Sequence, residues 1–294
     1  MQIINPKEIK PQEFHAYMLG AIAPRPIAFA STMDKNGNPN LSPFSFFNAF
    51  GSNPPLLIFS PALRGRDGAT KNTLDNVREV GEVVINVVTY NMVQQTSLAS
   101  TEYPKGVNEF IKAGFTPEPS HLIKPFRVKE SPVQMECKVR EIIQTGTYGG
   151  AAMLVICEIL LMHIKEEVLD EAGKIDQSKI DLVGRMGGNY YSRSSRGLFI
   201  VPKPNTKIGI GFDQLPEQIR TSTILTGNDL GILANAEQLP TEEMMTEFMK
   251  DISVQKLIAT IKDDPQNKIT VQHLAARELL AANNIAEAWK VLML

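Results

Sequence analysis

Residues 67–77, DGATKNTLDNV, place a lysine among hydroxyl and amide side chains directly before an apolar pattern. Thr70, Asn72 or Thr73 can accept hydrogen bonds from the free N–H groups of a helix's first turn, as an ordinary N-cap does. The same N–H groups, together with the charge of Lys71, can instead hold an anion such as phosphate. The local sequence favours the cap, because caps occur at most helices. The two interpretations are compatible, since one cap satisfies only part of the first turn.

The other polar residues form no recognisable catalytic set. No Ser/His/Asp, Cys/His or paired-carboxylate arrangement stands out, and the dinucleotide fingerprint GxGxxG is absent. His15, His121 and His273 are far apart in the sequence and lack metal-ligand spacing, so we predict no metal site. The two cysteines, Cys137 and Cys157, are too few for a disulfide framework or a paired CxxC zinc site.

Composition describes a soluble globular protein with a large core. The chain has 294 residues, a formal net charge of −2, 43% hydrophobic residues and 21% charged residues, which allows one large domain or two smaller ones. No stretch is long and apolar enough to span a bilayer, and the first residues lack the order of a secretory signal, so we expect a cytoplasmic protein. No basic run gives an electrostatic case for nucleic acid.

The first 90 residues favour strands interrupted by turns and one helix. PIAFAST (26–32) and LLIFSP (56–61) are β-favouring runs, and the Asn-Gly turn in DKNGNP predicts a hairpin. Residues 72–80 are expected to form a helix that stops at Gly81, followed by a strand in EVVINVVTY. Residues 91–131 suggest short helices and loops that cross the sheet.

A second hairpin is predicted over residues 132–164. Odd positions from Val133 to Val139 are apolar and even positions from Gln134 to Arg140 are polar, which indicates an antiparallel strand with one buried and one wet face. A turn centred near Thr147 would place Cys137 opposite Cys157. We expect both to be reduced core residues.

The composition changes beyond about residue 211. Residues 212–240 are expected to be a loop-rich connector, and residues 241–294 a helical extension that ends in two short amphipathic helices parted by Asn283 and Asn284. A methionine-rich stripe in this extension is interpreted as core. We therefore expect a first domain over 1–211, the connector, and a helical tail.

Residues 24–61, followed by RDGATKNTLDNV, resemble the flavin reductase-like proteins of the FMN-binding split-barrel group. The resemblance continues through EVVINVV and the second hairpin to GRMGGNYYSRSSRGLFIVPKP, and so covers about the first 204 residues. Its most specific parts are the NLSPFSFF strand and the Lys-Asn-Thr loop, because they occur in the right order and spacing.

This resemblance implies a mainly β fold with helices: a six-stranded antiparallel Greek-key split barrel, here followed by the C-terminal helical extension. It also implies a non-covalent FMN and a homodimer with each flavin near the subunit interface. The phosphate would bind at the Lys-Asn-Thr loop and the ring along the serine-bearing strand. The implied cofactor-binding residues are Ser31, Thr32, Ser42, Phe44, Ser45, Lys71, Asn72 and Thr73.

Several further residues are weaker candidates. Arg25, between two prolines, is expected to reach either a phosphate or the solvent. The resemblance places His163 near the nicotinamide side of the flavin, although a capped strand end explains it equally well. Arg185, Tyr190 and Tyr191 match the closing segment of the family and would shape the substrate side of the pocket.

The implied chemistry fits the lack of a catalytic set, because a flavin accepts hydride at N5 without an acid or nucleophile from the protein. We therefore predict an FMN-dependent oxidoreductase, and specifically an NAD(P)H-dependent flavin reductase. One alternative is a flavoredoxin-like electron carrier that a partner protein reduces. Another is a non-enzymatic interaction module that acts through the helical tail.

Overall fold

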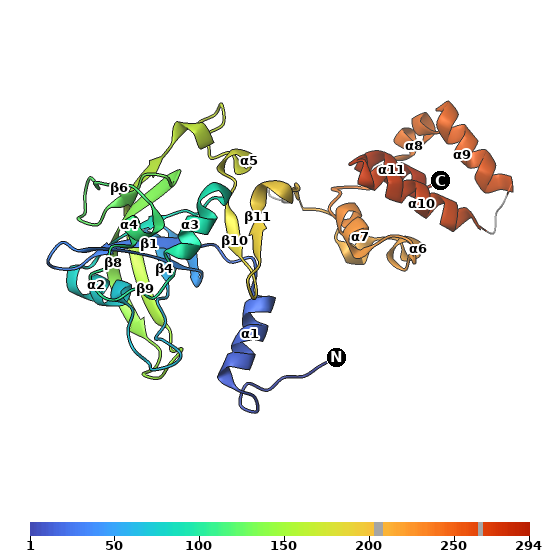
Figure 1. Ribbon diagram of the computed structural model, residues 1–294. Helices are drawn as coiled ribbons and strands as arrows, with labels where there is room; N and C mark the ends of the chain where they lie inside the picture. Colours follow the sequence, from blue (N-terminus) through green and yellow to red (C-terminus); the bar gives the residue numbers. More distant parts are fainter. Residues whose placement is uncertain (203–207, 264–266) are drawn as a thin grey trace. The chain divides into compact units, whose positions relative to one another are not determined.

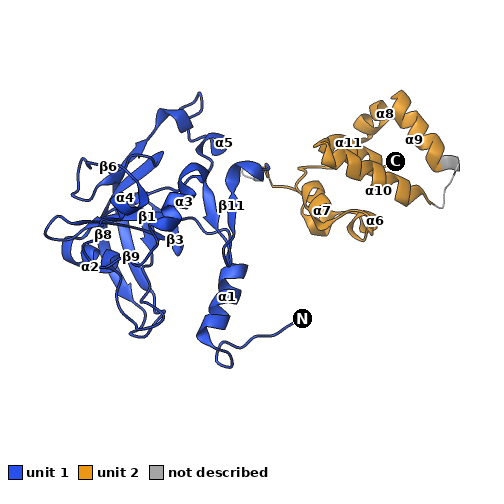
Figure 2. Ribbon diagram, viewed as in Figure 1, with its two compact units in different colours: residues 1–199 blue, residues 200–294 orange. Residues whose placement is uncertain are grey.

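The computed structural model describes residues 1–202, 208–263 and 267–294. The end of the segment that carries the resemblance, residues 203–204, lies outside the described residues. The chain forms two compact units, residues 1–199 and 200–294, and each has its own hydrophobic core (Figure 2).

The first unit is built on one antiparallel sheet (Figure 1). Its strands are β1 (Ala28–Met33), β2 (Pro39–Phe44), β3 (Phe47–Ser52), β4 (Pro55–Phe59), β5 (Glu82–Asn86), β8 (Val133–Gln144) and β9 (Met153–Ile164), in the order β2-β1-β5-β8-β9-β4-β3. The expected six strands are therefore seven, because the segment from Pro39 to Ser52 forms two strands instead of one. Within the described residues β2 and β3 are the edges, so the sheet is not closed.

Short elements cover this sheet and connect its strands. They are α1 (Pro11–Ala21), α2 (Asn72–Val80), η1 (Tyr90–Met92), α3 (Val93–Leu98), α4 (Glu109–Ala113), β6 (Pro117–Glu118), β7 (Arg127–Val128), η2 (Glu166–Val168), α5 (Gln177–Ile180), β10 (Val183–Arg185), β11 (Tyr191–Arg193) and η3 (Ser194–Arg196). The predicted β1–β2 hairpin and the short helices of residues 91–131 are confirmed.

Two cores lie on opposite faces of β1. Ala28 and Ala30 pack with α2 and the interior of β4, β8 and β9, while Phe29 packs against α4. This division follows from the alternation of side chains along a strand. It places α2 directly over the β1–β2 hairpin.

The second hairpin, β8–β9, is confirmed, but its register is not the expected one. Cys137 pairs with Ile159, and Cys157 pairs with Val139, because irregularities after Glu136 and after Val139 shift the ladder. Both thiols are free and buried, and burial raises the pKa of Cys137 to about 12. They remain reduced core residues, as expected.

The face of β8 that was expected to be wet is partly buried. Gln134 and Glu136 are both buried because the segment before β8 covers them. Gln134 donates to the carbonyls of Val128 and Ser131 at 2.9 and 3.0 Å. A strand alternation alone does not reveal that an irregular segment lies on its polar face.

The second unit is helical. It contains η4 (Phe212–Gln214), α6 (Glu217–Arg220), α7 (Gly227–Ala234), α8 (Glu242–Phe248), α9 (Ile252–Asp263), α10 (Lys268–Ala281) and α11 (Ile285–Leu292). Residues 212–240 are not the expected connector, because Ile219 and Leu233 are buried in one core with Trp289, whose indole N–H donates to the Leu233 carbonyl at 3.2 Å. The methionine-rich stripe is core only in part, since Phe248 is buried and Met249 is exposed.

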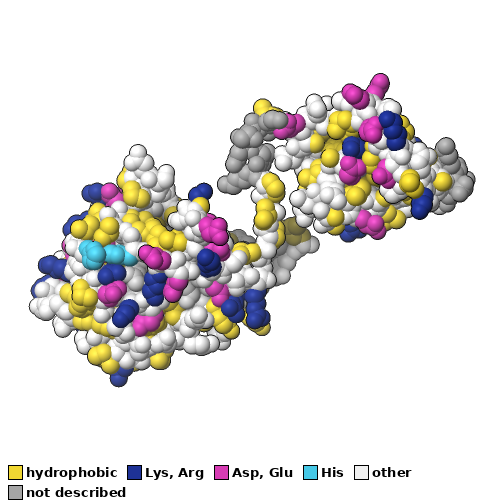
Figure 3. Space-filling model, turned by 90° about the horizontal axis from the view of Figure 1, so that it is seen from above, with side chains coloured by type: hydrophobic (Ala, Val, Ile, Leu, Met, Phe, Trp, Pro, Cys, Tyr) yellow, Lys and Arg dark blue, Asp and Glu magenta, His cyan; other side chains and the backbone are white. Residues whose placement is uncertain are grey.

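Charges of both signs are interspersed on the face shown in Figure 3. Among the helices of the described residues, none has the length and apolar character needed to cross a bilayer.

Candidate functional site

The helix that follows the lysine-containing loop begins without a side-chain cap. Lys71 occupies the N-cap position of α2, and its side chain makes no capping hydrogen bond. The expected cap from Thr70, Asn72 or Thr73 is therefore wrong, and the Thr70 hydroxyl instead bonds to Asp75 at 3.2 Å. The Leu74 N–H donates to the Lys71 carbonyl at 2.9 Å, so the N–H groups of Asn72 and Thr73 are the ones left to another acceptor. The helix ends at Gly81 as predicted.

A buried polar network fixes α2 on the hairpin beneath it. The Asn40 side-chain amide donates to Thr32 Oγ1 at 3.2 Å and to Thr73 Oγ1 at 2.9 Å, and the Asn76 amide donates to Thr32 Oγ1 at 3.1 Å. All four side chains are buried. Thr32 and Thr73 therefore position the helix, because losing a partner in such a network costs about 1–3 kcal/mol.

Cationic side chains gather beside the start of α2. The Lys71 ammonium lies 5.3 Å from the centroid of the Phe44 ring. Arg64 Nε is buried without a hydrogen-bond partner among the described residues, and its nearest carboxylate, Glu102, lies at 3.8 Å. Glu102 is also paired with Arg66 at 3.0 Å. Positive charge on Arg64 and Lys71 is therefore only partly compensated.

Burial lowers the pKa of Lys71 below its ordinary value. Glu102 opposes this shift in part, and the neighbouring charge of Arg64 adds to it. A half-buried lysine close to a second cation gains stability when an anion binds between them. Together with the free N–H groups of α2, these cations fit a phosphate.

The loop that carries Arg64 is held against the turn between β8 and β9. Leu63 exchanges backbone hydrogen bonds with Gly150 and Ala151, both at 3.0 Å. A Cβ at Gly149 would lie 2.7 Å from the carbonyl oxygen of Gly65 and 2.9 Å from that of Arg64. Only glycine allows this approach, so the turn of the second hairpin helps to place the cation.

The strand β2 presents two predicted residues beside the cationic cluster. Ser42 and Phe44 pair with Ala30 and Ala28, and they share the strand face of Asn40, which holds α2. Phe44 is buried below Lys71, whereas Ser42 is partly exposed. The Ser42 hydroxyl therefore lies next to the phosphate-type site, while Phe44 supports Lys71 from the core.

Three of the remaining predicted residues have other surroundings. Ser31 is on the opposite face of β1, fully buried, and its hydroxyl has no partner in the described part of the chain. Asn72 lines a small cavity of about 20 Å³ together with Asp34, and as the first residue of α2 it offers its backbone N–H at the helix start. Ser45 follows β2 and accepts a hydrogen bond from Arg25 Nε at 3.4 Å.

The Arg25 guanidinium does not reach the solvent, which was one of the two expectations, because it is buried and bonded within the chain. Its Nη1 donates to the carbonyls of Leu19 and Ile22 at 2.8 and 2.7 Å, and its Nη2 donates to that of Met186 at 3.0 Å. The buried guanidinium therefore connects the end of α1, the strand end near Ser45 and the β10–β11 hairpin.

His163 is paired with a buried carboxylate that the sequence did not identify. Its Nε2 lies 2.7 Å from Oε1 of Glu136, which is fully buried and also accepts from the N–H groups of His121 and Leu122 at 2.8 and 2.7 Å. Burial raises the pKa of Glu136, but these hydrogen bonds outweigh burial and hold the pKa below its ordinary value. This fixed carboxylate explains His163 better than a strand-end cap.

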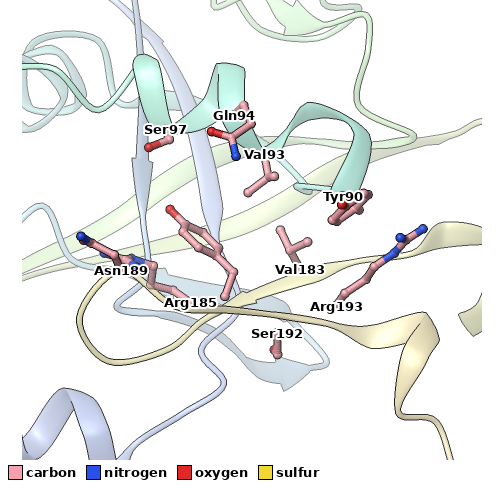
Figure 4. Close-up of a pocket in the computed structure, with 10 residues that line it drawn as sticks. Tyr90, Val93, Gln94, Ser97, Val183, Arg185, Asn189, Ser192 and Arg193 are labelled. Atoms are coloured by element: carbon pink, nitrogen blue, oxygen red, sulfur yellow. The ribbon is translucent and has the colours of Figure 1, made fainter.

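The closing segment forms one wall of a separate cavity of about 330 Å³ (Figure 4). Arg185 and Tyr191 line it, and the guanidinium lies 4.7 Å from the tyrosine ring. Tyr190 is exposed instead, and only its carbonyl contacts Arg185, at 3.1 Å. Sequence reasoning missed Arg64 at the candidate site, and it missed Glu136 as the buried partner of His163. The basic spacing in LRGRDG was the one available signal for Arg64.

Comparison with known proteins identifies the family of the first unit. Residues 19–191 match the family model described as "Flavin reductase like domain". An uncharacterized protein of Aquifex aeolicus is 36% identical over 188 residues, which cover 64% of this chain and 93% of that protein.

Solved structures show the same fold. Nitrilotriacetate monooxygenase component B from Bacillus cereus is 29% identical with a TM-score of 0.63, and the match covers 69% of this chain and 98% of that one. A protein with a split barrel domain from Shewanella frigidimarina is 25% identical with a TM-score of 0.59, covering 69% and 99%. The first unit therefore has the split-barrel fold that the sequence predicted. Because the family model matches more than half of its residues, the chain belongs to the flavin reductase-like family.

Proposed function

We propose that the protein binds FMN and transfers electrons from NADH or NADPH to it. One observation carries this proposal: the uncapped start of α2 combines with two under-compensated cations, Lys71 and Arg64, next to the serine-bearing strand β2. In a chain of the flavin reductase-like family, that arrangement is suited to the phosphate end of a flavin nucleotide.

The binding roles follow from the positions of the side chains. Lys71 and Arg64 would neutralise the phosphate, and the N–H groups of Asn72 and Thr73 would donate to it. Charge-assisted hydrogen bonds contribute about 1.5–3 kcal/mol each, so a few of them give micromolar affinity or better. Ser42, and Ser45 just past the end of β2, would bind the polar edge of the ring, and Phe44, buried beneath Lys71, would hold the lysine in place.

The flavin, when bound, supplies the redox chemistry by accepting hydride at its N5. The chain's own contribution is to bind the phosphate, to orient the ring edge and to hold the local backbone rigid. The buried network of Asn40, Thr32 and Thr73 provides that rigidity, because it fixes the start of α2 relative to β2. No acid or base from the chain is required at the hydride step.

The name of one similar protein is consistent with a redox function. Nitrilotriacetate monooxygenase component B is one part of a redox system. The proposal that a nucleotide reduces this protein directly therefore needs its own test, because a protein partner is the alternative donor.

We further propose that the protein is a homodimer. Helix α1 buries none of its residues, and β3 is an edge strand whose Phe50 is 64% exposed. Ile22, just after α1, is 60% exposed. Exposed apolar residues on an edge strand and an uncovered helix favour a second copy as the covering partner.

The direct experiment is an anaerobic titration of the purified, FMN-loaded full chain with NADH and with NADPH. We expect at least one nucleotide to bleach the flavin absorbance rapidly and completely. Bound FMN that neither nucleotide bleaches would contradict the reductase and favour an electron carrier reduced by a protein.

A further inference from the structure

The cavity of about 330 Å³ in the first unit lies between two elements that are distant in the sequence (Figure 4). One wall is formed by η1 and α3, from which Tyr90, Gln94 and Ser97 line the space. The other wall is the β10–β11 hairpin, which contributes Arg185 and Arg193. These are different residues from those beside the start of α2.

The hairpin register explains why its polar and aromatic side chains share this wall. Arg185 pairs with Tyr191, and Val183 pairs with Arg193. Directly paired residues, and residues two apart on one strand, lie on the same face of a sheet. All four therefore lie on one face of the hairpin, and all four line the cavity.

The two arginines of the cavity differ in charge compensation. Arg193 is neutralised by Asp181, since its Nε lies 3.0 and 2.9 Å from the two carboxylate oxygens and its Nη2 lies 2.7 Å from one of them. For the Arg185 guanidinium, the one hydrogen bond found in the described residues is to the carbonyl of Tyr190 at 3.1 Å.

A second buried cation increases this excess of positive charge. The backbones of Arg25 and Arg185 exchange hydrogen bonds of 2.9 and 2.8 Å. The guanidinium of Arg25 bonds to neutral carbonyl groups, so it brings charge without a carboxylate. No acidic side chain lines the cavity among the described residues.

Aromatic faces flank the cavity on both sides. The Arg193 guanidinium lies 3.8 Å from the Tyr90 ring, and that of Arg185 lies 4.7 Å from the Tyr191 ring. Gln94 and Ser97 add a side-chain amide and a hydroxyl. Flat guanidinium and phenol surfaces suit a flat ligand, because they stack on aromatic rings.

We propose that this cavity binds a small planar anion, namely a single aromatic ring that carries a carboxylate or a phosphate. Arg185 would hold the anionic group and Tyr90 and Tyr191 would contact the ring. The volume is at the small end of ligand sites, which suits one ring rather than a dinucleotide. This site goes beyond the flavin site and does not depend on it.

The test is isothermal titration calorimetry of the full chain with benzoate and with phenyl phosphate, which represent the two anionic groups. Neutral benzamide and non-planar cyclohexanecarboxylate are the matched ligands. We expect at least one aromatic anion to bind at one site. Both matched ligands should have a Kd that is higher by about ten-fold or more, or show no binding. Absence of binding by both anions, or equal binding of benzamide, would overturn the proposal.

The variant Arg185→Gln should weaken anion binding by about ten-fold or more, because it removes the charge but keeps the backbone bridge to Arg25. The control Arg196→Gln changes an exposed arginine of η3 that does not line the cavity, and it should have no effect. Unchanged anion affinity in Arg185→Gln would contradict the assignment.

FMN titration of the same variants separates the two sites. Arg185→Gln should bind FMN as the parent does, and loss of FMN would show that the cavity belongs to the flavin site, which overturns this inference. A protein that binds the aromatic anion but no FMN would contradict the proposed function alone. If Arg185→Gln fails to fold, Tyr191→Leu replaces it and should abolish the preference for benzoate over cyclohexanecarboxylate, whereas a retained preference contradicts the proposal.

Discussion

At the scale of single residues, the charge beside the start of α2 decides the proposed cofactor site. Lys71 is held over Phe44 and next to Arg64 in surroundings that lower its pKa, so its protonated form is destabilised unless an anion is bound. The position of Lys71 could be predicted from the loop sequence. That of Arg64 could not, because a turn more than 80 residues away places it.

Replacing Lys71 by methionine should weaken FMN binding while the fold survives. The change removes one charge-assisted interaction of about 1.5–3 kcal/mol, which corresponds to a rise in Kd of roughly ten-fold or more. Fluorescence titration of FMN measures this, with Lys35→Met as the control because Lys35 is an exposed lysine of the β1–β2 turn. Equal affinities of both variants would show that Lys71 is not the anchor.

The same lysine should make FMN affinity depend on alkaline pH. Burial lowers the pKa of Lys71 from 10.5, so its positive charge is lost at a lower pH than in an ordinary lysine. The Kd for FMN should therefore rise with pH before 10.5 is reached. Lys71→Arg should retain its affinity for FMN over that range, because arginine stays protonated. An identical rise of the Kd with pH in Lys71→Arg would show that deprotonation of Lys71 is not the cause.

Glu136→Gln should destabilise the first unit by about 1–3 kcal/mol at neutral pH, since a buried carboxylate with three partners is replaced by a neutral amide. The pKa of Glu136 is lower in the folded than in the unfolded chain, so its stabilisation is present above the unfolded pKa and is lost as pH falls. Urea unfolding as a function of pH should therefore show that the free energy of unfolding falls less steeply with decreasing pH in Glu136→Gln than in the parent. Glu141→Gln, at an exposed position, is the control. If the free energy of unfolding of Glu136→Gln and of the parent fell equally steeply with decreasing pH, the stabilising role of the Glu136 carboxylate would be refuted.

At the scale of elements, local sequence patterns predicted the helices and strands more accurately than the register in which the strands pair. The α2 bounds and the β8–β9 hairpin followed from capping glycine and alternation, which act within a few residues. The register of Cys137 and Cys157 did not, because two irregularities in the ladder leave no local signal. Ser31 and Thr32 were predicted together, although strand alternation places adjacent residues on opposite faces, as the structure shows.

The exposed edge strand β3 gives a prediction at this scale. Phe50→Asp should convert the proposed dimer to a monomer, because it introduces a charge into an apolar contact. Light scattering coupled to size-exclusion chromatography measures the mass. Ile111→Asp is the control, since Ile111 is an exposed apolar residue of α4. A monomeric parent, or a dimer that survives Phe50→Asp, would contradict the interface.

At the scale of the whole molecule, the chain consists of a family domain and a second unit with its own core. The sequence predicted the helical tail but placed its beginning about 40 residues too late. Residues 212–240 are rich in turn-forming residues, and the apolar side chains buried among them, such as Ile219 and Leu233, pack in one core with residues of α10 and α11. That long-range contact has no local signature.

A chain of residues 1–199 should therefore fold and bind FMN with a Kd within a few-fold of that of the full chain, because every residue of the proposed flavin site lies in the first unit. A chain that ends at residue 240 should aggregate, since Ile219 and Leu233 lose their core partners. Loss of FMN binding in a folded 1–199 chain would show that the second unit takes part in the site.

The most direct measurement of the central claim is the stoichiometry of FMN bound by the purified full chain, determined by equilibrium dialysis and the visible spectrum. We expect a yellow protein that holds one FMN per chain at micromolar or tighter affinity. A colourless protein that takes up no FMN from excess would contradict it.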